Sequence, residues 1–445
     1  MGGGLLQLVA YGAQDVYLTG NPQITFFKVV YRRHTNFAME AIQQTFSGIA
    51  DFNSTITCQI SRNGDLIHRT YLQVDIPALS DANDKYVNYL GLRLLKSVSI
   101  EIGGQQIDKH YSDWLYIWNE LSLPRGKRSS WEFMVGADQD ITKSGGTLYV
   151  PFEFWFCRNI GLSLPLIALQ YHEVKVKVEF DNVNNCVYKV NGNNTEASTG
   201  TPKLSAVSLW VDYIFLDTDE RRKFAQLSHE YLIEQLQTFT EGLSGGQTQN
   251  YRINFNHPCK ELVWVAKLSS SASVNQWYNY TIKNNNSFGN GASIIGGSTA
   301  QAIDSNIHAF TNAVSLSDSL VRSKILYNVE PGFNKDAVNP FTNCLLRLNG
   351  NDRFASREGT YFNYVQPYQH HTNIPANCGI NVYSFALKPE EHQPSGTLNM
   401  SRIDSAILQV TNKYDSTKSG SILIYATNYN VLRILSGMGG LAYSN

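Results

Sequence analysis

Apolar and polar residues alternate with the two-residue period of β-strands in many short runs of this chain. In the first half such runs cover residues 37–48, 56–60, 66–76, 94–102, 148–156, 166–171, 174–180 and 206–216. In the second half they cover residues 231–239, 251–255, 261–266, 345–348, 381–387, 406–411 and 422–435. We therefore expect a mainly β protein made of two sets of strands.

Turn residues separate several of these runs. Asn63-Gly64 lies between the runs 56–60 and 66–76, and an Asn-Gly pair in that position predicts a β-hairpin. The run 94–102 ends at Gly103-Gly104. A Ser-, Asn- and Gly-rich tract covers residues 269–312, and a loop of that length inside a compact domain is usually functional or exposed.

Two segments have the pattern of short helices instead. Within residues 111–121 the apolar side chains recur at helical spacing, and Ser112 stands where a helix cap is expected. From Asp217 the acids come first and the bases follow, which suits a helix aligned with its own dipole. Capping also explains Asp217 and Asp219 better than cation binding does.

The two halves resemble each other weakly. In each half a strand is followed by a Gly-Gly or Asn-Gly pair, an aromatic polar segment, an aromatic-rich strand, a Ser and Pro turn and two more strands. Two copies of one β-sandwich explain this order. The predicted domains are an amino-terminal arm (1–25), a first sandwich (26–216), a helical linker (217–228) and a second sandwich (229–445).

Composition agrees with two domains and narrows the function. The chain has 445 residues, more than a single core usually supports, with 42% hydrophobic and 12% aromatic residues. Its formal charge of −1 speaks against wrapping of nucleic acid. The six cysteines lie far apart with no CxxC pair, so we expect reduced, buried thiols. Neither a signal peptide nor an apolar run of 18 residues is present, so we expect no secretion by that route and no membrane span.

No catalytic, metal or cofactor site is expected. His110, Ser112 and Asp113 are the residue types of a hydrolase triad, but they are nearly consecutive, so local capping is the better interpretation. His370-His371 and His172-Glu173 lack metal-site spacing and are interpreted as surface or strand histidines. The glycines at 437, 439 and 440 indicate a tight turn, because no helix can follow them to bind phosphate. A sandwich glycosidase would need paired inward carboxylates, and the strands offer few.

Several longer blocks resemble one protein family. The segment Leu8 to Arg33 (LVAYGAQDVYLTGNPQITFFKVVYRR) resembles the amino terminus of the major capsid proteins of nucleocytoplasmic large DNA viruses, above all those of chlorella viruses. The resemblance recurs in the blocks ISRNGDL (60–66), EIGGQQIDKHY (101–111), LPLIALQYHEV (164–174), VDYIFLD (211–217), HEYLIEQLQ (229–237), YFNYVQPY (361–368), YSFALKP (383–389) and YNVLRILSGMGGLAY (429–443). It weakens at 122–147, 182–203 and 242–343.

This resemblance implies an all-β fold of two tandem eight-stranded antiparallel jelly-roll sandwiches with short helices in the loops. It also implies a structural, non-enzymatic role. Homotrimers would form pseudo-hexagonal capsomers that tile the icosahedral outer shell of a large double-stranded DNA virus. The implied partners are neighbouring capsomers, minor capsid and penton proteins, and indirectly an inner membrane, but not nucleic acid. The protein would be assembled in the host cytoplasm and reside in the virion capsid.

Within that picture we expect residues 5–27 to be an inner-face arm that locks each capsomer to its neighbours or to minor capsid proteins; the alternative is an arm that covers its own sandwich. Lys28, Arg32 and Arg33, next to His34, form the compact basic cluster of the chain. This cluster is a candidate contact for acidic partners or lipid headgroups, although a solvated strand face is the plainer interpretation.

The tract 269–312 would form an outward tower. Asn279, Asn285 and Asn399 are candidate glycosylation sites, and Asn53 and Asn193 lie in the same N-x-S/T context, which chance also produces in an Asn-rich chain. A carbohydrate-binding role is the second functional hypothesis, with Trp277, Tyr278 and Tyr280 stacking on host sugars.

Overall fold

The computed structural model describes residues 3–23, 33–81, 83–137, 145–189, 196–197, 202–273, 275–282, 339–375, 377, 379–414 and 419–443. The chain divides into two compact units, Met1–Phe37 and Ala38–Asn445. The predicted domain limits at residues 25, 216 and 228 stay a prediction.

The amino-terminal unit contains two short helices, α1 (Gly3–Val9) and α2 (Val16–Thr19). The Asp15 carboxylate accepts a hydrogen bond of 2.7 Å from the backbone N–H of Gly12, and α2 ends at Gly20. The large apolar side chains of this unit are exposed: Leu5, Leu6, Leu8, Val9, Tyr11, Val16, Tyr17 and Leu18. Leaving so much apolar surface in water is unfavourable, so this unit has the character of a binding segment.

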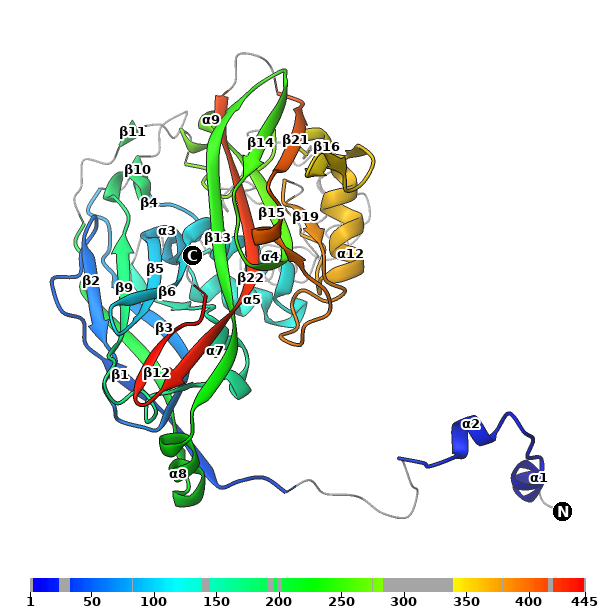
Figure 1. Ribbon diagram of the computed structural model, residues 1–445. Coiled ribbons are helices and arrows are strands. Elements are labelled where there is room, and N and C mark those ends of the chain that lie inside the picture. The colour runs from blue at the N-terminus through cyan, green and yellow to red at the C-terminus, as the bar shows by residue number, and fades with distance from the viewer. Residues whose placement is uncertain are drawn as a thin grey trace. The chain divides into compact units, whose positions relative to one another are not determined.

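The first half of the large unit contains two antiparallel sheets (Figure 1). One has the order β1 (Phe37–Gln44), β12 (Ala206–Leu216), β3 (Leu66–Ile76) and β7 (Gly146–Pro151), with β8 (Leu164–Pro165) also paired to β3. The other has the order β2 (Thr55–Gln59), β9 (Val174–Phe180), β5 (Leu95–Ile102) and β6 (Gln105–Tyr111). In β9 burial alternates residue by residue, as the sequence pattern predicts for a strand with one face in the core.

Short elements connect these sheets. A small sheet has the order β11 (Glu196–Ala197), β10 (Val187–Lys189) and β4 (Asp84–Tyr86). The helices are α3 (Leu90–Leu94), α4 (Ser112–Ser122), α5 (Arg125–Met134), α7 (Trp155–Arg158), η1 (Ile160–Leu162) and η2 (Val183–Asn185).

The second half repeats the two-sheet plan. Its larger sheet has the order β13 (His229–Ser244), β22 (Ser419–Leu435), β15 (Pro258–Leu268) and β19 (Asn381–Ser384), with β20 (Leu398–Asn399) and β23 (Met438–Leu441) at its margins. Its smaller sheet has the order β14 (Thr248–Ile253), β21 (Ala406–Asn412), β16 (Phe341–Leu348) and β17 (Asn351–Asp352), with β18 (Arg357–Glu358) paired to β16. Figure 1 shows β13 and β22 as long neighbouring strands, antiparallel from end to end.

The other elements that the structure describes are short helices between the halves and in the second half. They are α8 (Thr218–Gln226), α9 (Ser269–Ala272), the π-helix η3 (Tyr361–Val365), α12 (Gln366–His370) and η4 (Met400–Arg402). Helix α8 confirms the predicted helix between the two halves, and the Asp217 side chain caps it by accepting a 2.8 Å hydrogen bond from the N–H of Thr218.

The predicted hairpin at Asn63-Gly64 is wrong. The two strands exist, but β2 pairs with β9 whereas β3 pairs with β12 and β7, so the turn joins two different sheets. Gly64 packs against Tyr213, where an added Cβ would lie 3.0 Å from the tyrosine Cβ. An Asn-Gly turn is compatible with a hairpin, but here the two strands belong to the two different sheets of a sandwich, and each buries one face between them.

The weak repeat between the halves has a structural counterpart. Gly103-Gly104 joins β5 to β6, and Asn349-Gly350 joins β16 to β17. All four residues have positive φ, from 49° to 83°, as two-residue antiparallel hairpins require.

The core of the first half extends into the second half. Trp114 and Trp118 of α4 are buried, and Trp114 packs against Tyr425 of β22 at a ring distance of 5.3 Å. The same apolar cluster includes Ile233 of β13 and Val263 of β15. Helix α4 is therefore an internal layer between the two halves, which explains why nine of its eleven residues are buried, including the polar Ser112, Asn119 and Glu120.

Candidate functional site

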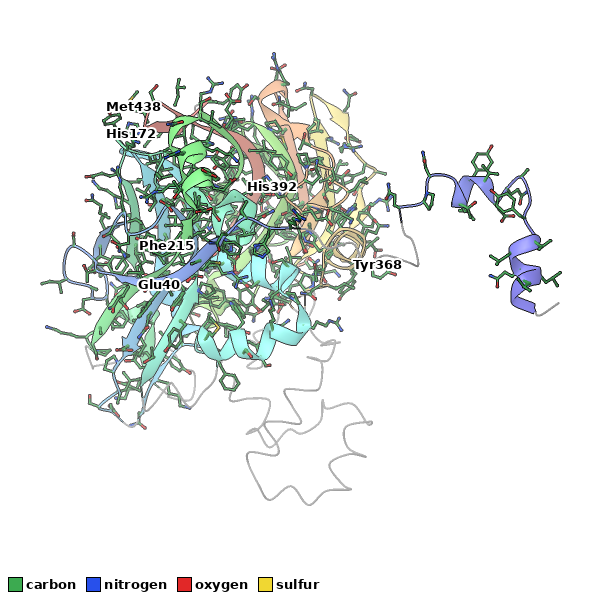
Figure 2. All side chains as sticks on the ribbon, turned by 90° about the horizontal axis from the view of Figure 1, so that it is seen from below. Glu40, His172, Phe215, Tyr368, His392 and Met438 are labelled. Atoms are coloured by element: carbon green, nitrogen blue, oxygen red, sulfur yellow. The ribbon has the colours of Figure 1, made fainter. Side chains whose placement is uncertain are left out.

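A cleft of about 780 Å³ lies where the two halves of the large unit meet. One wall comes from β3 and from the α7–η1 segment, and the other comes from β13 and the loop after β19. The lining residues are His68, Arg69, Trp155, Arg158, Asn159, Ile160, Leu162, Glu234, Glu390, Glu391, His392 and Gln393. Figure 2 labels His392.

A buried ionic cluster lies beside this cleft. The Glu234 side chain is only 4% exposed, and its two oxygens lie 2.8 Å from a guanidinium nitrogen of Arg158 and 2.8 Å from Lys260 Nζ. Lys260 also donates a 2.6 Å hydrogen bond to the carbonyl of Pro389, and the Arg158 guanidinium stacks on Trp118 at 4.6 Å. Because Arg158 belongs to the first half and the other two ionised groups to the second, this cluster joins the halves.

The charges of the cluster are mutually dependent. Burial by itself would raise the pKa of Glu234, but the charges of Arg158 and Lys260 outweigh it and hold that pKa well below its usual range. Burial lowers the pKa of Lys260, and the attraction of Glu234 opposes this shift. Removing either partner would leave an ion in a poorly solvated place.

A second buried network stands behind the same loop. His371, with a fully buried side chain, lies 2.9 Å from Glu261 through Nε2 and 2.9 Å from Glu390 through Nδ1. Burial opposes the charged form, but the two carboxylates dominate and raise the pKa of His371 to about 9. The sequence interpretation of His371 as a surface or strand histidine is therefore wrong.

This arrangement predicts a pH dependence of stability. A folded-state pKa near 9, against 6.5 for the unfolded chain, means that the contribution of His371 is complete below pH 6.5 and is lost as the pH rises to about 9. We expect the urea midpoint of the wild type to fall across that window and the midpoint of His371→Gln to fall less. Unfolding curves measured at several pH values test this, and parallel profiles for both proteins would contradict it.

Another ion pair, which is partly buried, lies elsewhere between the halves. Asp113 of α4 is 2.9 Å from Lys267 of β15, and Tyr280 Oη donates a 2.8 Å hydrogen bond to the same carboxylate. Burial would raise the pKa of Asp113, but Lys267 lowers it below its usual value.

The expected sugar-stacking aromatics belong to this interior. Tyr278 and Tyr280 are buried, Tyr278 stacks on Tyr116 at 4.7 Å, and the Arg93 guanidinium stacks on Trp277 at 3.9 Å. Placing these three residues in an outward tower was wrong, because their apolar rings are worth more in the core between the halves than in water. The rest of the predicted tower, residues 283–312, lies outside the described residues.

The three residues with triad chemistry point to different partners. His110 Nε2 lies 2.9 Å from Asp108, Ser112 Oγ donates a 2.8 Å hydrogen bond to the carbonyl of Leu92, and Asp113 pairs with Lys267. These residues do not form a triad. The predicted capping by Ser112 and Asp113 is also wrong, because the N-cap residue of α4 is Tyr111 and its side chain makes no capping hydrogen bond.

Other candidate residues have structural surroundings. His172 Nδ1 lies 2.8 Å from the carbonyl oxygen of Gly439, and Gly437 has φ of 81° in the turn between β22 and β23, which confirms the predicted tight turn. Five cysteines are free and buried, and burial raises the pKa of Cys157 to about 12. Cys378 lies outside the described residues. Within the part of the chain that is described, no three His, Cys, Asp or Glu side chains gather as metal ligands, and no helix is long and apolar enough to cross a bilayer.

The candidate glycosylation and partner residues have different positions. Asn279 is 0% exposed, and its Oδ1 accepts hydrogen bonds from the N–H and Oγ1 of Thr281, so the folded chain cannot present it to an enzyme. Asn399 is exposed, as is Arg33. Asn285, Asn193, Lys28 and Arg32 lie outside the described residues.

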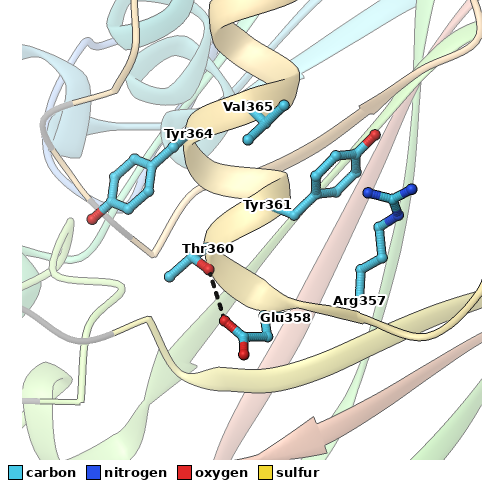
Figure 3. Close-up of a pocket in the computed structure, with 6 residues that line it drawn as sticks. All are labelled: Arg357, Glu358, Thr360, Tyr361, Tyr364 and Val365. Atoms are coloured by element: carbon cyan, nitrogen blue, oxygen red, sulfur yellow. Dashed lines mark hydrogen bonds between the residues drawn. The ribbon is translucent and has the colours of Figure 1, made fainter.

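Two further features lie on the surface. A shallow pocket of about 320 Å³ is lined by Arg357, Glu358, Thr360, Tyr361, Tyr364 and Val365 (Figure 3). In it the Arg357 guanidinium stacks on Tyr361 at 4.3 Å. An exposed apolar patch comprises Tyr171, Leu435 and Met438, and the N–H of Tyr171 donates a 2.9 Å hydrogen bond to Gly437. Figure 2 shows His172 and Met438 close together there.

Sequence reasoning missed the ionic cluster at the cleft. Its one local indication is the adjacent pair Lys260-Glu261 inside the apolar strand β15, where two charges are unexpected. The partners Arg158 and Glu234 lie far from it in sequence and had no such indication.

The chain matches two family models. One, described as "Major capsid protein N-terminus", matches residues 25–217, and the other, described as "Large eukaryotic DNA virus major capsid protein", matches residues 220–440. The major capsid proteins of Pyramimonas orientalis virus and Paramecium bursaria Chlorella virus 1 are 47% and 44% identical to it, over 100% of both chains in each case.

Solved structures give the same result. The crystal structure of PBCV-1 VP54 has a TM-score of 0.77 at 39% identity, covering 95% of this chain and 100% of that one. The quasi-atomic model of the PBCV-1 virus capsid has a TM-score of 0.75 at the same identity and coverage. The Faustovirus major capsid protein, at 14% identity and a TM-score of 0.72, is similar in fold over 96% of this chain and 94% of its own. These similarities confirm the mostly β, double jelly-roll fold with short helices.

Proposed function

Because the chain belongs to the major capsid protein family of large eukaryotic DNA viruses, we propose that three copies of it form one pseudo-hexagonal capsomer. The protein is a structural component of an icosahedral capsid and is not an enzyme. The observation that supports the proposal is the repeated two-sheet plan: three chains with two similar sandwiches each supply six similar lobes.

The junction between the halves suits such a building block. A capsomer keeps its shape only if its two sandwiches hold a fixed orientation, and here α4 and the charges of Arg158, Glu234 and Lys260 join them. Domains that meet through small, polar surfaces tend to move relative to one another. Here the junction combines an apolar cluster with ion pairs that are largely buried. The proposed domains keep the limits 1–25, 26–216, 217–228 and 229–445.

The mass of the purified protein in solution tests the trimer. We expect a particle of three times the chain mass of 49.9 kDa, measured by light scattering or native mass spectrometry. A dilution series separates a stable trimer from weak association. A protein that remains a monomer at high concentration would contradict the proposal.

The remaining partners follow from the same proposal. The amino-terminal arm would contact neighbouring capsomers or minor capsid proteins on the inner face, with penton proteins at the vertices and assembly in the host cytoplasm. The exposed apolar side chains of residues 5–18 support this role for the arm. Lys28, Arg32 and Arg33 would meet acidic partners or lipid headgroups there.

Glycans on outward loops are the second part of the proposal. The candidate glycosylation sites are Asn279, Asn285 and Asn399, and of those that the structure describes, Asn399 is exposed. The intact mass of the virion protein tests this, and Asn399→Gln should remove any mass added at that site. An unmodified chain mass would exclude glycans.

A further inference from the structure

The carboxylates that line the cleft between the halves already have partners. Glu234 is paired with Arg158 and Lys260. Glu390 is paired with His371 and accepts a 2.9 Å hydrogen bond from the N–H of Thr372. Glu391 lies 2.9 Å from Lys388 Nζ. The negative charge of the cleft is therefore neutralised from within the protein.

The hydrogen-bond donors of the cleft are in the opposite situation. Arg69 is exposed, and its guanidinium makes no hydrogen bond or ion pair within the described ranges. Its charge acts to lower the pKa of the partly buried Glu153, although desolvation dominates and raises that pKa. Asn159 Oδ1 accepts a hydrogen bond from the N–H of Gly161, which leaves its Nδ2 group unused among the described residues. The Gln393 amide is likewise unused there.

In the part of the chain that the structure describes, the cleft therefore has hydrogen-bond donors without partners, whereas its carboxylates are already paired with cations. Such a cleft suits an anionic ligand. We propose that the cleft is an oxyanion site, in which Arg69, Asn159 Nδ2 and the Gln393 amide hold a carboxylate or a phosphate. A guanidinium binds either group through charge-assisted, often paired hydrogen bonds. The volume of about 780 Å³ lies in the range of small-molecule sites and leaves room for more than the bare anion.

The surroundings add selectivity for charge and shape. The wall of Trp155, Ile160 and Leu162 is apolar, so water is partly excluded and each hydrogen bond to the anion gains strength. A cation would find Glu234, Glu390 and Glu391 already engaged. The oxyanion could be free phosphate or the carboxylate of a side chain, and both present the same oxygens to Arg69.

Calorimetric titration of the purified protein tests the site. The probes are inorganic phosphate and the carboxylate of N-acetylglutamate amide, each compared with chloride at equal ionic strength. The proteins are wild type, Arg69→Gln and the control Arg402→Gln, which removes an exposed arginine outside the cleft. We expect wild type and control to bind alike and Arg69→Gln to bind about tenfold or more weakly.

The outcomes are separable. If phosphate binds more tightly than N-acetylglutamate amide, the site is assigned to a free anion. If N-acetylglutamate amide binds more tightly, the site is assigned to a carboxylate side chain of a protein. If Arg69→Gln does not fold, Asn159→Ala takes its place as the test variant. It is also expected to bind the probes more weakly than wild type. The solution mass of each variant is the control for folding and assembly. A variant that keeps the wild-type mass but loses binding supports the site, whatever the oligomeric state of the wild type. Absence of binding of both probes to wild type, or equal binding by Arg69→Gln and Arg402→Gln, overturns the proposal.

Discussion

Lys260→Met is expected to lower the free energy of unfolding by about 3–5 kcal/mol, the usual cost of breaking a buried ion pair. The Lys260 side chain is 1% exposed and lies between Glu234 and the carbonyl of Pro389. Methionine fills a similar volume, so the loss comes from charge and hydrogen bonds rather than from a cavity. Glu234 would keep Arg158 as an ionic partner, with His392 Nδ1 3.5 Å away. Urea unfolding followed by tryptophan fluorescence measures the change.

Lys388→Met is the matched control for this experiment. Lys388 also pairs with a glutamate at 2.9 Å, but both side chains are more than half exposed. Exposed pairs contribute little, so the control should change the free energy of unfolding by less than about 1 kcal/mol. Equal stability of Lys260→Met and wild type would show that the buried cluster does not hold the two halves together.

Deletion of residues 1–23 is expected to abolish shell assembly and to leave capsomers intact. The physical reason is the division of the chain: both apolar clusters lie in residues 38–445, whereas the deleted segment has eight large apolar side chains exposed. Removing it costs the fold little and removes apolar surface that a partner would bury. Sedimentation and electron microscopy of assembly reactions measure the effect.

A triple substitution tests whether assembly needs the apolar side chains of the arm or only its length. Replacing Leu5, Leu6 and Leu8 together by serine keeps the chain length and should impair assembly nearly as much as the deletion. The melting temperature of both variants should equal that of wild type. Normal shells from the deleted protein would show that the arm has no role in joining capsomers.

The limits of local sequence reasoning are clear at particular residues. Helices at 112–122 and 218–226 were predictable because spacing and charge order are local properties. The Asn63-Gly64 hairpin failed because strand pairing is decided by which faces are buried, and that depends on strands 70 to 148 residues away. Trp277, Tyr278 and Tyr280 were misplaced because a polar neighbourhood hid their burial.

By itself, the sequence determined the fold class, two sandwiches of antiparallel strands with short helices, and the family to which the chain belongs. The alternation of apolar and polar residues, the turn residues and the long family blocks are local features of the sequence, so they can be found without the folded structure. The contacts between the halves, Glu234 with Arg158 and Asp113 with Lys267, follow only from the folded structure. Members of these pairs stand 76 to 154 residues apart, and only folding both sandwiches against one another removes the water that would otherwise keep their charges separate.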